Sequence, residues 1–357
     1  MRCMLIVGAR PQFIKVAPVR RALLAAGHHA VVVHTGQHYD AQMSDVFFRD
    51  LELPPPDVQL QIGSAGHGEQ TGRMLIALEA AMQADPPDWV VVFGDTNSTL
   101  AGALAACKLQ LSLAHVEAGL RSFNRAMPEE HNRVLADHCS DVLLCPTPTA
   151  VQHLANEGIR ANVHLVGDVM VDALHQGVAR AATQSHILES LALQPGAYAV
   201  ATVHRPANSD DPAQLARIVR ALGELALPVV FPVHPRTRPH LAAYAAVIES
   251  SAIQLIPPVG YLDMLQLTQH ARVVLTDSGG LQKEAYCLGV PCVTLRSETE
   301  WTETTAAGWN VVVGSDPAAI VAAAQRPRPA TPPAPVFGLG DAAPQIVRIL
   351  EQFHDNA

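Results

Sequence analysis

The chain has 357 residues, of which 49% are apolar and 16% are charged, and its net charge is −9. This length exceeds what one hydrophobic core usually supports, so we expect two domains of a globular protein. The acidic balance argues against nucleic acid or an acidic membrane as the main partner. No apolar run is long enough to span a membrane, and the first residues lack the features of a signal peptide, so we expect a cytoplasmic protein.

The spacing of cysteine and histidine does not indicate a metal centre. The six cysteines form no C-x-x-C pair and mostly lie in apolar runs, which favours reduced thiols in the core. The seventeen histidines show neither an H-E-x-x-H pattern nor a clustered ligand spacing. We therefore expect no metal site.

Short apolar strands alternate with helical patterns along most of the chain, which is typical of parallel sheets covered by helices on both faces. The alternation falls into two series, so we predict an α/β fold with two Rossmann-like, doubly wound domains. The predicted domains are residues 1–168 and 169–340, and a helix within 341–357 is expected to cross back to the first domain. The predicted strands are Cys3–Val7, Ala30–His34, Trp89–Phe93, Ser112–Val116, Val142–Cys145, Tyr198–Val203, Val229–Pro232, Gln254–Ile256, Val273–Thr276 and Cys292–Leu295.

The first predicted strand ends in a polar segment that suits an anionic ligand. In sheets of this kind ligands bind at the carboxyl ends of the strands. The run 8–15 reads G-A-R-P-Q-F-I-K and not G-x-G-x-x-G, so no dinucleotide cofactor is indicated. Arg10 and Lys15 place two cations near the start of the first helix. The alternative is that both lie on a solvated face.

Three acidic residues follow strands or open a helix in the first series. Asp95 comes just after Trp89–Phe93, where it is either a helix cap or a functional residue. Glu117 directly follows an apolar strand, which is a poor place for a carboxylate unless it is paired or functional. Glu129 lies next to Glu130 at a predicted helix start, where acidic side chains also complement the helix dipole.

The second series carries histidines and a glycine-rich turn at its strand ends. His204 and His234 each end a strand, and Arg205 follows the first of them. The turn at 277–280 reads D-S-G-G and begins a helix. Its free N–H groups and a serine hydroxyl suit a phosphate, and Glu284 on the first two turns suits a ribose. The alternative is an ordinary strand-to-helix turn.

Two other polar segments, 34–40 and 66–73, indicate ligand binding or regulation more than catalysis. They include Gln37, His38 and Arg73. An ordinary loop and helix cap would read the same way.

The ordered motifs resemble those of the non-hydrolysing UDP-N-acetylglucosamine 2-epimerases along essentially the whole chain. The matching motifs are G-A-R-P-Q-F-I-K (8–15), G-D-T-N-S-T-L-A (94–101), H-V-E-A-G-L-R (115–121), P-E-E-x-N-R (128–133), T-V-H-R (202–205), P-V-H-P (232–235) and T-D-S-G-G-L-Q-K-E-A (276–285). The resemblance implies a GT-B-like architecture with the UDP-sugar in a cleft between two domains. It also implies a homodimer and a reaction without a cofactor.

The resemblance assigns roles to individual residues. Asp95, Glu117, Glu129 and His204 match the catalytic positions of the family. Gln37, His38 and Arg73 fall where some members bind a second, activating UDP-sugar. The positions that match the binding of the substrate and its UDP group are Arg10, Lys15, Arg205, His234, Ser278, Gly279, Gly280 and Glu284.

Two departures from the family pattern concern the substrate. Gln12 stands where the first motif usually has glutamate, and Trp301 replaces an arginine that contacts the nucleotide in the family. The combination looks like a branch that includes 2-epimerases of UDP-2,3-diacetamido-2,3-dideoxyglucuronate, a precursor of surface polysaccharides. The competing functions are a GT-B glycosyltransferase, a hydrolysing epimerase and a non-catalytic UDP-sugar sensor. We see no acceptor patch that would favour the transferase.

Overall fold

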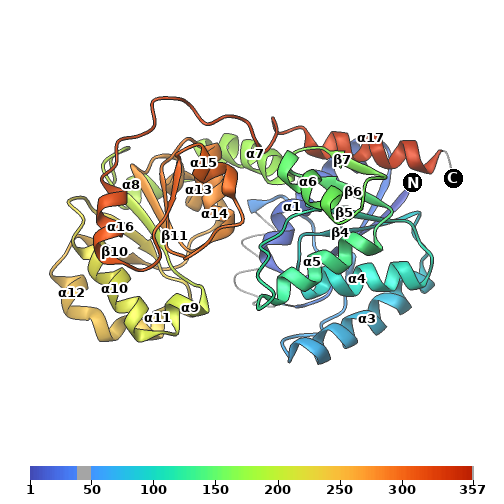
Figure 1. The fold of residues 1–357 in the computed structure, drawn as a ribbon, viewed down its shortest axis with the longest axis horizontal. Helices are drawn as coiled ribbons and strands as arrows, with labels where there is room; N and C mark the ends of the chain where they lie inside the picture. The colour runs from blue at the N-terminus through green and yellow to red at the C-terminus, as the bar shows by residue number, and fades with distance from the viewer. Residues whose placement is uncertain (38–49, 356–357) are drawn as a thin grey trace. The chain divides into compact units, whose positions relative to one another are not determined.

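The computed structural model describes residues 1–37 and 50–355 and contains two parallel sheets (Figure 1). Contacts divide the chain into two compact units. Unit 1 comprises Met1–Gln176 and Val336–Ala357, and unit 2 comprises Gly177–Pro335. None of the helices in the described residues is both long and apolar enough to cross a membrane.

The sheet of unit 1 has seven parallel strands in the order β3-β2-β1-β4-β5-β6-β7. Its central strands are almost continuously apolar and buried, as expected when helices cover both faces of a parallel sheet. The strands are β1 (Arg2–Val7), β2 (His29–His34), β3 (Val58–Gln59), β4 (Trp89–Phe93), β5 (Leu113–Val116), β6 (Val142–Cys145) and β7 (Val163–Leu165).

The helices of unit 1 begin at residues that suit a first turn. Thr96 and Thr147 accept hydrogen bonds from backbone amides as N-caps, and Pro128 and Pro148 occupy first helical positions. The helices are α1 (Arg10–Ala25), α3 (His67–Ala84), α4 (Asn97–Lys108), α5 (Pro128–Cys139), α6 (Pro148–Asn156) and α17 (Ala342–His354), together with α7 (Val169–Gln184), which ends in unit 2.

The last helix packs on unit 1, although it follows unit 2 in the chain. α17 lies against α1, and Glu351 on it contacts His28 at 2.7 Å (Figure 1). Asp172 on α7 accepts hydrogen bonds from the amides of Ala342 and Ala343 at 3.2 and 3.0 Å. The Asp172 carboxylate therefore satisfies amides at the start of α17 that have no partner within the helix.

Unit 2 repeats the same topology with six parallel strands in the order β10-β9-β8-β11-β12-β13. The strands are β8 (Ala199–Thr202), β9 (Val229–Pro232), β10 (Ile253–Ile256), β11 (Val273–Thr276), β12 (Cys292–Thr294) and β13 (Asn310–Val312). The helices are α8 (Ile187–Ser190), α9 (Pro206–Ser209), α10 (Pro212–Gly223), α11 (Arg238–Leu241), η1 (Ala242–Tyr244), α12 (Ala245–Glu249), α13 (Tyr261–Gln269), α14 (Gly279–Cys287), α15 (Thr302–Ala306) and α16 (Pro317–Ala324).

Each sheet has one point at which the strand order reverses direction. In unit 1 this point lies between β1 and β4, and in unit 2 it lies between β8 and β11. The segments that leave such neighbouring strands diverge to opposite faces of the sheet, and ligands of doubly wound folds bind beside their carboxyl ends. The segments that leave the strands at these two points carry Gly8, Asp95, His204 and Asp277.

Candidate active site

Asp95 lies in the turn between β4 and α4 and is tied to α5. Thr96, not Asp95, caps α4, because its side chain accepts a hydrogen bond from the amide of Thr99. The Asp95 carboxylate instead contacts the guanidinium of Arg133, and its carbonyl accepts a hydrogen bond of 2.9 Å from Asn132. Asp95 keeps about a third of its side chain exposed (32%), so it is held in place while remaining accessible.

Glu117 follows β5 and forms an ion pair with Lys15 of α1, and the two side chains are only 9% and 10% exposed. Its φ of 73° is in the left-handed region, where a side chain is strained. The Lys15 ammonium also lies against the end of β4, since a Cβ on Gly94 would come within 3.1 Å of it. The Lys15 ammonium thus supplies the opposite charge that a carboxylate directly after an apolar strand needs. It also brings a residue predicted to bind the substrate into contact with a residue predicted to be catalytic.

Gln12 connects the ends of β1 and β4. Its amide oxygen accepts hydrogen bonds from Gly8 and Ala9 at 2.8 and 3.1 Å, and its nitrogen donates to the Phe93 carbonyl at 2.8 Å. An ionised glutamate could not donate to that carbonyl. The replacement of the usual glutamate therefore supplies a bond between the two strands at the reversal point. Arg10 begins α1, and its side chain lies outside the described part of the structure.

The two glutamates at the start of α5 differ in their surroundings. Glu129 is exposed, whereas Glu130 is buried. Glu130 accepts hydrogen bonds from the amides of Ser122 and Phe123, both at 2.9 Å, and from Arg133 at 3.0 Å. Burial alone would raise the pKa of Glu130, but these hydrogen bonds and the Arg133 charge bring it below its usual value. Glu130 therefore fixes the loop after β5 and leaves Glu129 accessible.

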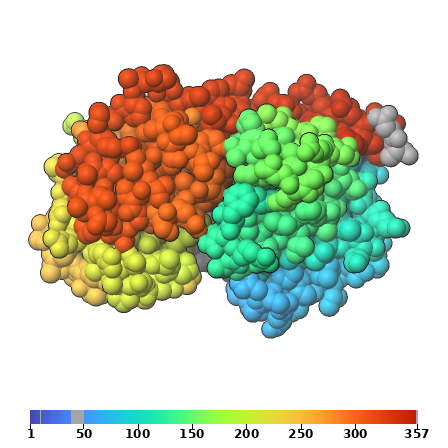
Figure 2. Space-filling view, viewed as in Figure 1, coloured from blue at the N-terminus to red at the C-terminus, as the bar shows by residue number. Residues whose placement is uncertain are grey.

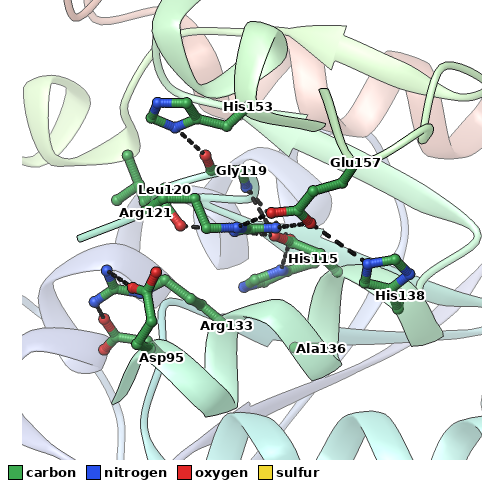
Figure 3. Close-up of polar contacts among 12 residues, drawn as sticks. Asp95, His115, Gly119, Leu120, Arg121, Arg133, Ala136, His138, His153 and Glu157 are labelled. Carbon is green, nitrogen blue, oxygen red and sulfur yellow. Dashed lines mark hydrogen bonds and ion pairs between the residues drawn. The ribbon is translucent and has the colours of Figure 1, made fainter. Parts of the chain in front are cut away.

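A second network of charged side chains in unit 1 includes Arg121, Glu157 and His115 (Figure 3). Arg121 donates to both oxygens of Glu157 at 2.6 and 2.7 Å and to Asp137 at 2.7 Å. His115 on β5 contacts Asp137 with one ring nitrogen and the Gly94 carbonyl with the other, both at 2.7 Å.

The charges in this network shift each other's titration. Burial would raise the pKa of Asp137, but His115 and Arg121 together hold it below its usual value. Burial would lower the pKa of Arg121, but its hydrogen bonds and the charges of both carboxylates raise it. The hydrogen bond from Arg121 lowers the pKa of Glu157. All four side chains are consequently held in one hydrogen-bonded arrangement.

Two of the residues predicted to bind an activator have different surroundings. Gln37 is buried and accepts hydrogen bonds from the amide and hydroxyl of Ser98 at 3.0 and 2.7 Å, so it is fixed on the first turn of α4. Arg73 lies on α3, which forms part of the surface of unit 1 (light blue in Figure 2), and its side chain is 51% exposed and paired with Glu69. His38 lies outside the described residues.

In unit 2, Asp277 organises the reversal point between β8 and β11. Its buried carboxylate accepts hydrogen bonds from the amides of His204 and Arg205 and from the side chain of Asn208, at 3.0–3.1 Å. The His204 ring is 36% exposed, its Nδ1 lies 3.4 Å from Asp277, and its centroid is 5.4 Å from that of His234. The two predicted histidines therefore lie side by side.

The start of α14 has the geometry expected of the D-S-G-G turn. Ser278 caps the helix, and a Cβ on Gly279 would overlap the Glu300 carboxylate, so a side chain there would require Glu300 to move. Glu284 is buried on the same helix. Trp301 is also buried, and the Lys283 ammonium lies 4.0 Å from its ring centroid, a cation–π contact.

In each unit the structure brings several predicted site residues to neighbouring strand ends, whereas Glu129 lies exposed on the first turn of α5 and Arg73 lies on α3. Unit 1 brings Lys15, Asp95 and Glu117 to the ends of β1, β4 and β5. Unit 2 brings His204, Arg205, His234, Ser278, Gly279, Gly280 and Glu284 to the ends of β8, β9 and β11 and to α14. The residues that the sequence reasoning missed hold these groups in place, namely His115, Glu130, Arg133, Asp137 and Asp277. All of them except Asp137 lie inside the recognised motifs, and their place in these motifs was the signal in the sequence that could have identified them.

Comparison with known proteins places the chain in one family. Residues 21–351 match the family model described as UDP-N-acetylglucosamine 2-epimerase. A UDP-N-acetylglucosamine 2-epimerase homolog of Methanococcus maripaludis is 48% identical over 98% of this chain and 99% of that protein. The UDP-2,3-diacetamido-2,3-dideoxy-D-glucuronate 2-epimerase of Pseudomonas aeruginosa is 49% identical over 88% of this chain and 89% of that protein.

The fold agrees with a solved structure over its whole length. The crystal structure of Methanocaldococcus jannaschii UDP-GlcNAc 2-epimerase in complex with UDP-GlcNAc and UDP has a TM-score of 0.90 and 42% identity, covering 99% of this chain and 100% of that chain. The predicted α/β, GT-B-like fold is confirmed. The chain belongs to the UDP-N-acetylglucosamine 2-epimerase family and is a UDP-sugar 2-epimerase, an isomerase.

Proposed function

We propose that the chain interconverts UDP-N-acetylglucosamine and UDP-N-acetylmannosamine by eliminating UDP and adding it back. The observation that carries this proposal is the position of Asp95 and Glu117 at the ends of adjacent strands, with Lys15 against both strand ends. Two carboxylates on one rigid edge suit a reaction that removes a proton from a sugar carbon and returns it to the other face.

The chemistry explains why UDP must leave. The C2 hydrogen of a sugar is barely acidic, because no carbonyl group is adjacent to it. When the C1–O bond to UDP breaks, positive charge develops at C1 and the C2 proton can be taken by a base. The products are 2-acetamidoglucal and UDP. Protonation of the glucal at C2 from the opposite face and re-addition of UDP at C1 give the epimer, with no net change in atoms or electrons.

The residues divide between these tasks. We assign Asp95, Glu117, Glu129 and His204 to proton transfer and to the charge that develops on the ring. The free amides at the start of α14, the Ser278 hydroxyl and the cations predicted in the sequence suit the diphosphate that leaves. Glu284 suits the ribose hydroxyls.

A second substrate is favoured by a specific observation. The relative that acts on the diacetamido-glucuronate sugar is 49% identical, and Trp301 replaces the usual arginine in this chain. Trp301 is buried beneath Lys283, so a cation is present next to the replaced position. UDP-2,3-diacetamido-2,3-dideoxyglucuronate is therefore the alternative substrate.

The test is NMR of the purified protein in D2O with each UDP-sugar in separate samples. Deuterium at C2 together with the manno epimer from UDP-N-acetylglucosamine supports the first substrate. Exchange with only the diacetamido sugar assigns the second. Release of free N-acetylmannosamine with no UDP-linked epimer would show a hydrolysing enzyme, and binding of UDP without exchange would point to a transferase or a sensor. If the reaction is quenched during turnover, the predicted 2-acetamidoglucal intermediate should be detected together with UDP.

Three further properties are proposed from the resemblance. They are a homodimer, a cytoplasmic location, and activation by a second UDP-sugar near Gln37, His38 and Arg73. Sedimentation equilibrium tests the dimer, and fractionation of cells tests the location. A sigmoidal dependence of rate on substrate that becomes hyperbolic in Arg73→Ala would support the activator site, whereas hyperbolic kinetics in the native protein would contradict it.

A further inference from the structure

In the part of the chain that the structure describes, the buried histidine of the H-V-E-A-G-L-R motif contacts two hydrogen-bond acceptors and no donor. The His115 side chain is fully buried, and its ring nitrogens lie 2.7 Å from the Asp137 carboxylate and 2.7 Å from the Gly94 carbonyl. A neutral imidazole carries one N–H and one lone pair. A neutral ring would therefore direct a nitrogen lone pair at an oxygen lone pair at one of the two contacts.

Asp137 does not offer a proton to relieve this conflict. One of its oxygens accepts a hydrogen bond from Arg121 at 2.7 Å, and the Gly119 amide donates to its two oxygens at 3.3 and 3.1 Å. All of these partners are donors, and they stabilise the ionised carboxylate. The proton required between Asp137 and His115 therefore belongs to the imidazole.

The charge count of the cluster leads to the same protonation state. Arg121 contributes one positive charge, and Asp137 and Glu157 contribute two negative charges. A protonated His115 makes the cluster neutral. A neutral ring would leave it with a net negative charge, although His115, Arg121 and Asp137 are buried and only Glu157, with 28% of its side chain exposed, reaches solvent. Four further titratable groups face the cluster or the backbone that it holds. His138 lies 3.4 Å from Glu157, the Cys145 thiol on β6 lies near Asp137, His153 lies 3.0 Å from the Gly119 carbonyl, and the Lys15 ammonium lies beside Gly94.

We propose that His115 is a buried imidazolium that positions the two acidic loops of unit 1. Its two N–H groups join the Gly94 carbonyl, one residue before Asp95, to Asp137. Asp137 in turn holds the amide of Gly119, two residues after Glu117. His115 does not touch the sugar in this proposal, so it is a positioning residue. The inference rests on the proposed roles of Asp95 and Glu117.

The imidazolium fixes two turns whose backbone has positive φ angles. Gly94, Glu117 and Gly119 have φ values of 62°, 73° and 80°, in the left-handed region that glycine adopts readily but that strains Glu117 between them. A Cβ on Gly119 would overlap the Ala150 carbonyl, so this turn is also tightly packed. Strained backbone persists only where its surroundings determine it. Loss of either ring contact would let one of the two loops relax.

The first experiment measures the protonation state without substrate. In protein labelled with ¹⁵N-histidine, both ring nitrogens of His115 should carry protons at pH 7.5, assigned by the loss of the signals in His115→Gln. A single protonated ring nitrogen at that pH would overturn the proposal. Because no substrate is present, this result is independent of which sugar the protein epimerises.

The second experiment separates positioning from packing. Glutamine and asparagine each replace one N–H of the ring, so His115→Gln and His115→Asn should each keep one contact and lose the other. We expect kcat to fall about 10- to 100-fold in both, with KM changed less than about threefold, as for a small misplacement of reacting groups. The amide of Gly119 should exchange faster in His115→Gln. His138→Gln, on the same helix as Asp137 and 49% exposed, is the matched control with unchanged kcat.

A third variant tests the charge. Asp137→Asn keeps a side chain of the same size but removes the counterion of the imidazolium, so the ring should lose its second proton at lower pH. The alkaline limb of kcat should then shift to lower pH, and the NMR titration of the ring should shift with it. Unchanged kcat in both His115 variants, or an alkaline limb that does not move in folded Asp137→Asn, would overturn the positioning role.

Discussion

Glu130→Gln tests whether a buried carboxylate holds the loop after β5. In the native protein one Glu130 oxygen accepts from Phe123, and the other accepts from the amide and hydroxyl of Ser122 and from Arg133. Glutamine has the same shape but only one acceptor oxygen. Its NH2 group must therefore face a donor, most directly the Phe123 amide, and Arg133 loses an anionic partner.

The expected cost follows from these contacts. A hydrogen bond to a charged group contributes about 1.5–3 kcal/mol, and we take about 2 kcal/mol for the part-buried bond between the Phe123 amide and the Glu130 carboxylate. This corresponds to a roughly 30-fold increase in the opening of the loop, since 1.4 kcal/mol is tenfold. Hydrogen exchange followed by mass spectrometry on a peptide covering 120–127 should show this acceleration. Glu129→Gln, at the adjacent exposed position, should leave the exchange unchanged.

The pH dependence of the stability difference between native protein and Glu130→Gln is a second test of the role of Glu130. The pKa of Glu130 is lowered in the folded protein, so its carboxylate contributes stability above the unfolded pKa of about 4.3. That contribution is lost as the pH falls through the lower folded value. The difference between native protein and Glu130→Gln should thus be largest at neutral pH and shrink below about pH 4. Equal exchange of the two proteins at pH 7 would refute the role of Glu130.

Three other predictions rest on separate features. Gly8→Ala should lower the free energy of unfolding in urea by about 1–3 kcal/mol, because the new Cβ overlaps Ser98 and Thr35. Gly72→Ala on α3 has open space around it and should raise the free energy of unfolding by about 0.5–1 kcal/mol. The reverse order of stabilities would contradict the packing at these positions. Burial raises the pKa of Cys3, Cys145 and Cys292 to about 12, so a thiol reagent at pH 8 should label exposed Cys107 in the native protein and these three only after unfolding. Glu117→Gln and His204→Ala should each lower kcat by about 10²- to 10⁴-fold with UDP affinity in calorimetry largely retained, and normal turnover in either would remove that residue from the mechanism.

Long, buried strands were predictable because their apolar runs are continuous. The bounds of β4, β6, β9 and β11 agree with the predicted Trp89–Phe93, Val142–Cys145, Val229–Pro232 and Val273–Thr276. The strands β3, β7 and β13 were missed. Each lies at the edge of its sheet and has only two or three residues, so it has one neighbour and no apolar run to mark it.

The strand-end residues were predictable, whereas their partners depended on the fold. Polar residues after buried strands pointed to Asp95, Glu117 and His204, and their catalytic roles stay predictions. The pairing of Lys15 with Glu117 joins residues that are far apart in the chain, and no local pattern reports it. Of the two glutamates at the start of α5, the sequence could not tell which is buried, because that depends on the loop that folds back onto Glu130.

The limits of the two domains also stay predictions. The sequence placed them at 168 and 340, where the patterns of strands and helices change, while contacts place the division at 176 and 335. The first difference lies in α7, a continuous helix that begins in one unit and ends in the other. Helical periodicity continues through such a junction, so the pattern gives no signal at the residue where the contacts change.

The charged residues of unit 1 are better explained by the geometry of its loops than by stability. A buried ion pair often contributes no more than apolar packing of the same size would. Here, however, the hydrogen bonds of the clusters end on backbone groups: the Gly94 carbonyl, the Gly119 amide and the amides of Ser122 and Phe123. Apolar side chains cannot fix such groups. A proton that leaves one face of a carbon and returns to the other requires two acid–base groups at set positions, and a shift of about 1 Å can cost 10²-fold in rate. A scaffold that binds the backbone beside each carboxylate meets this requirement, while the carboxylates themselves stay available to the sugar.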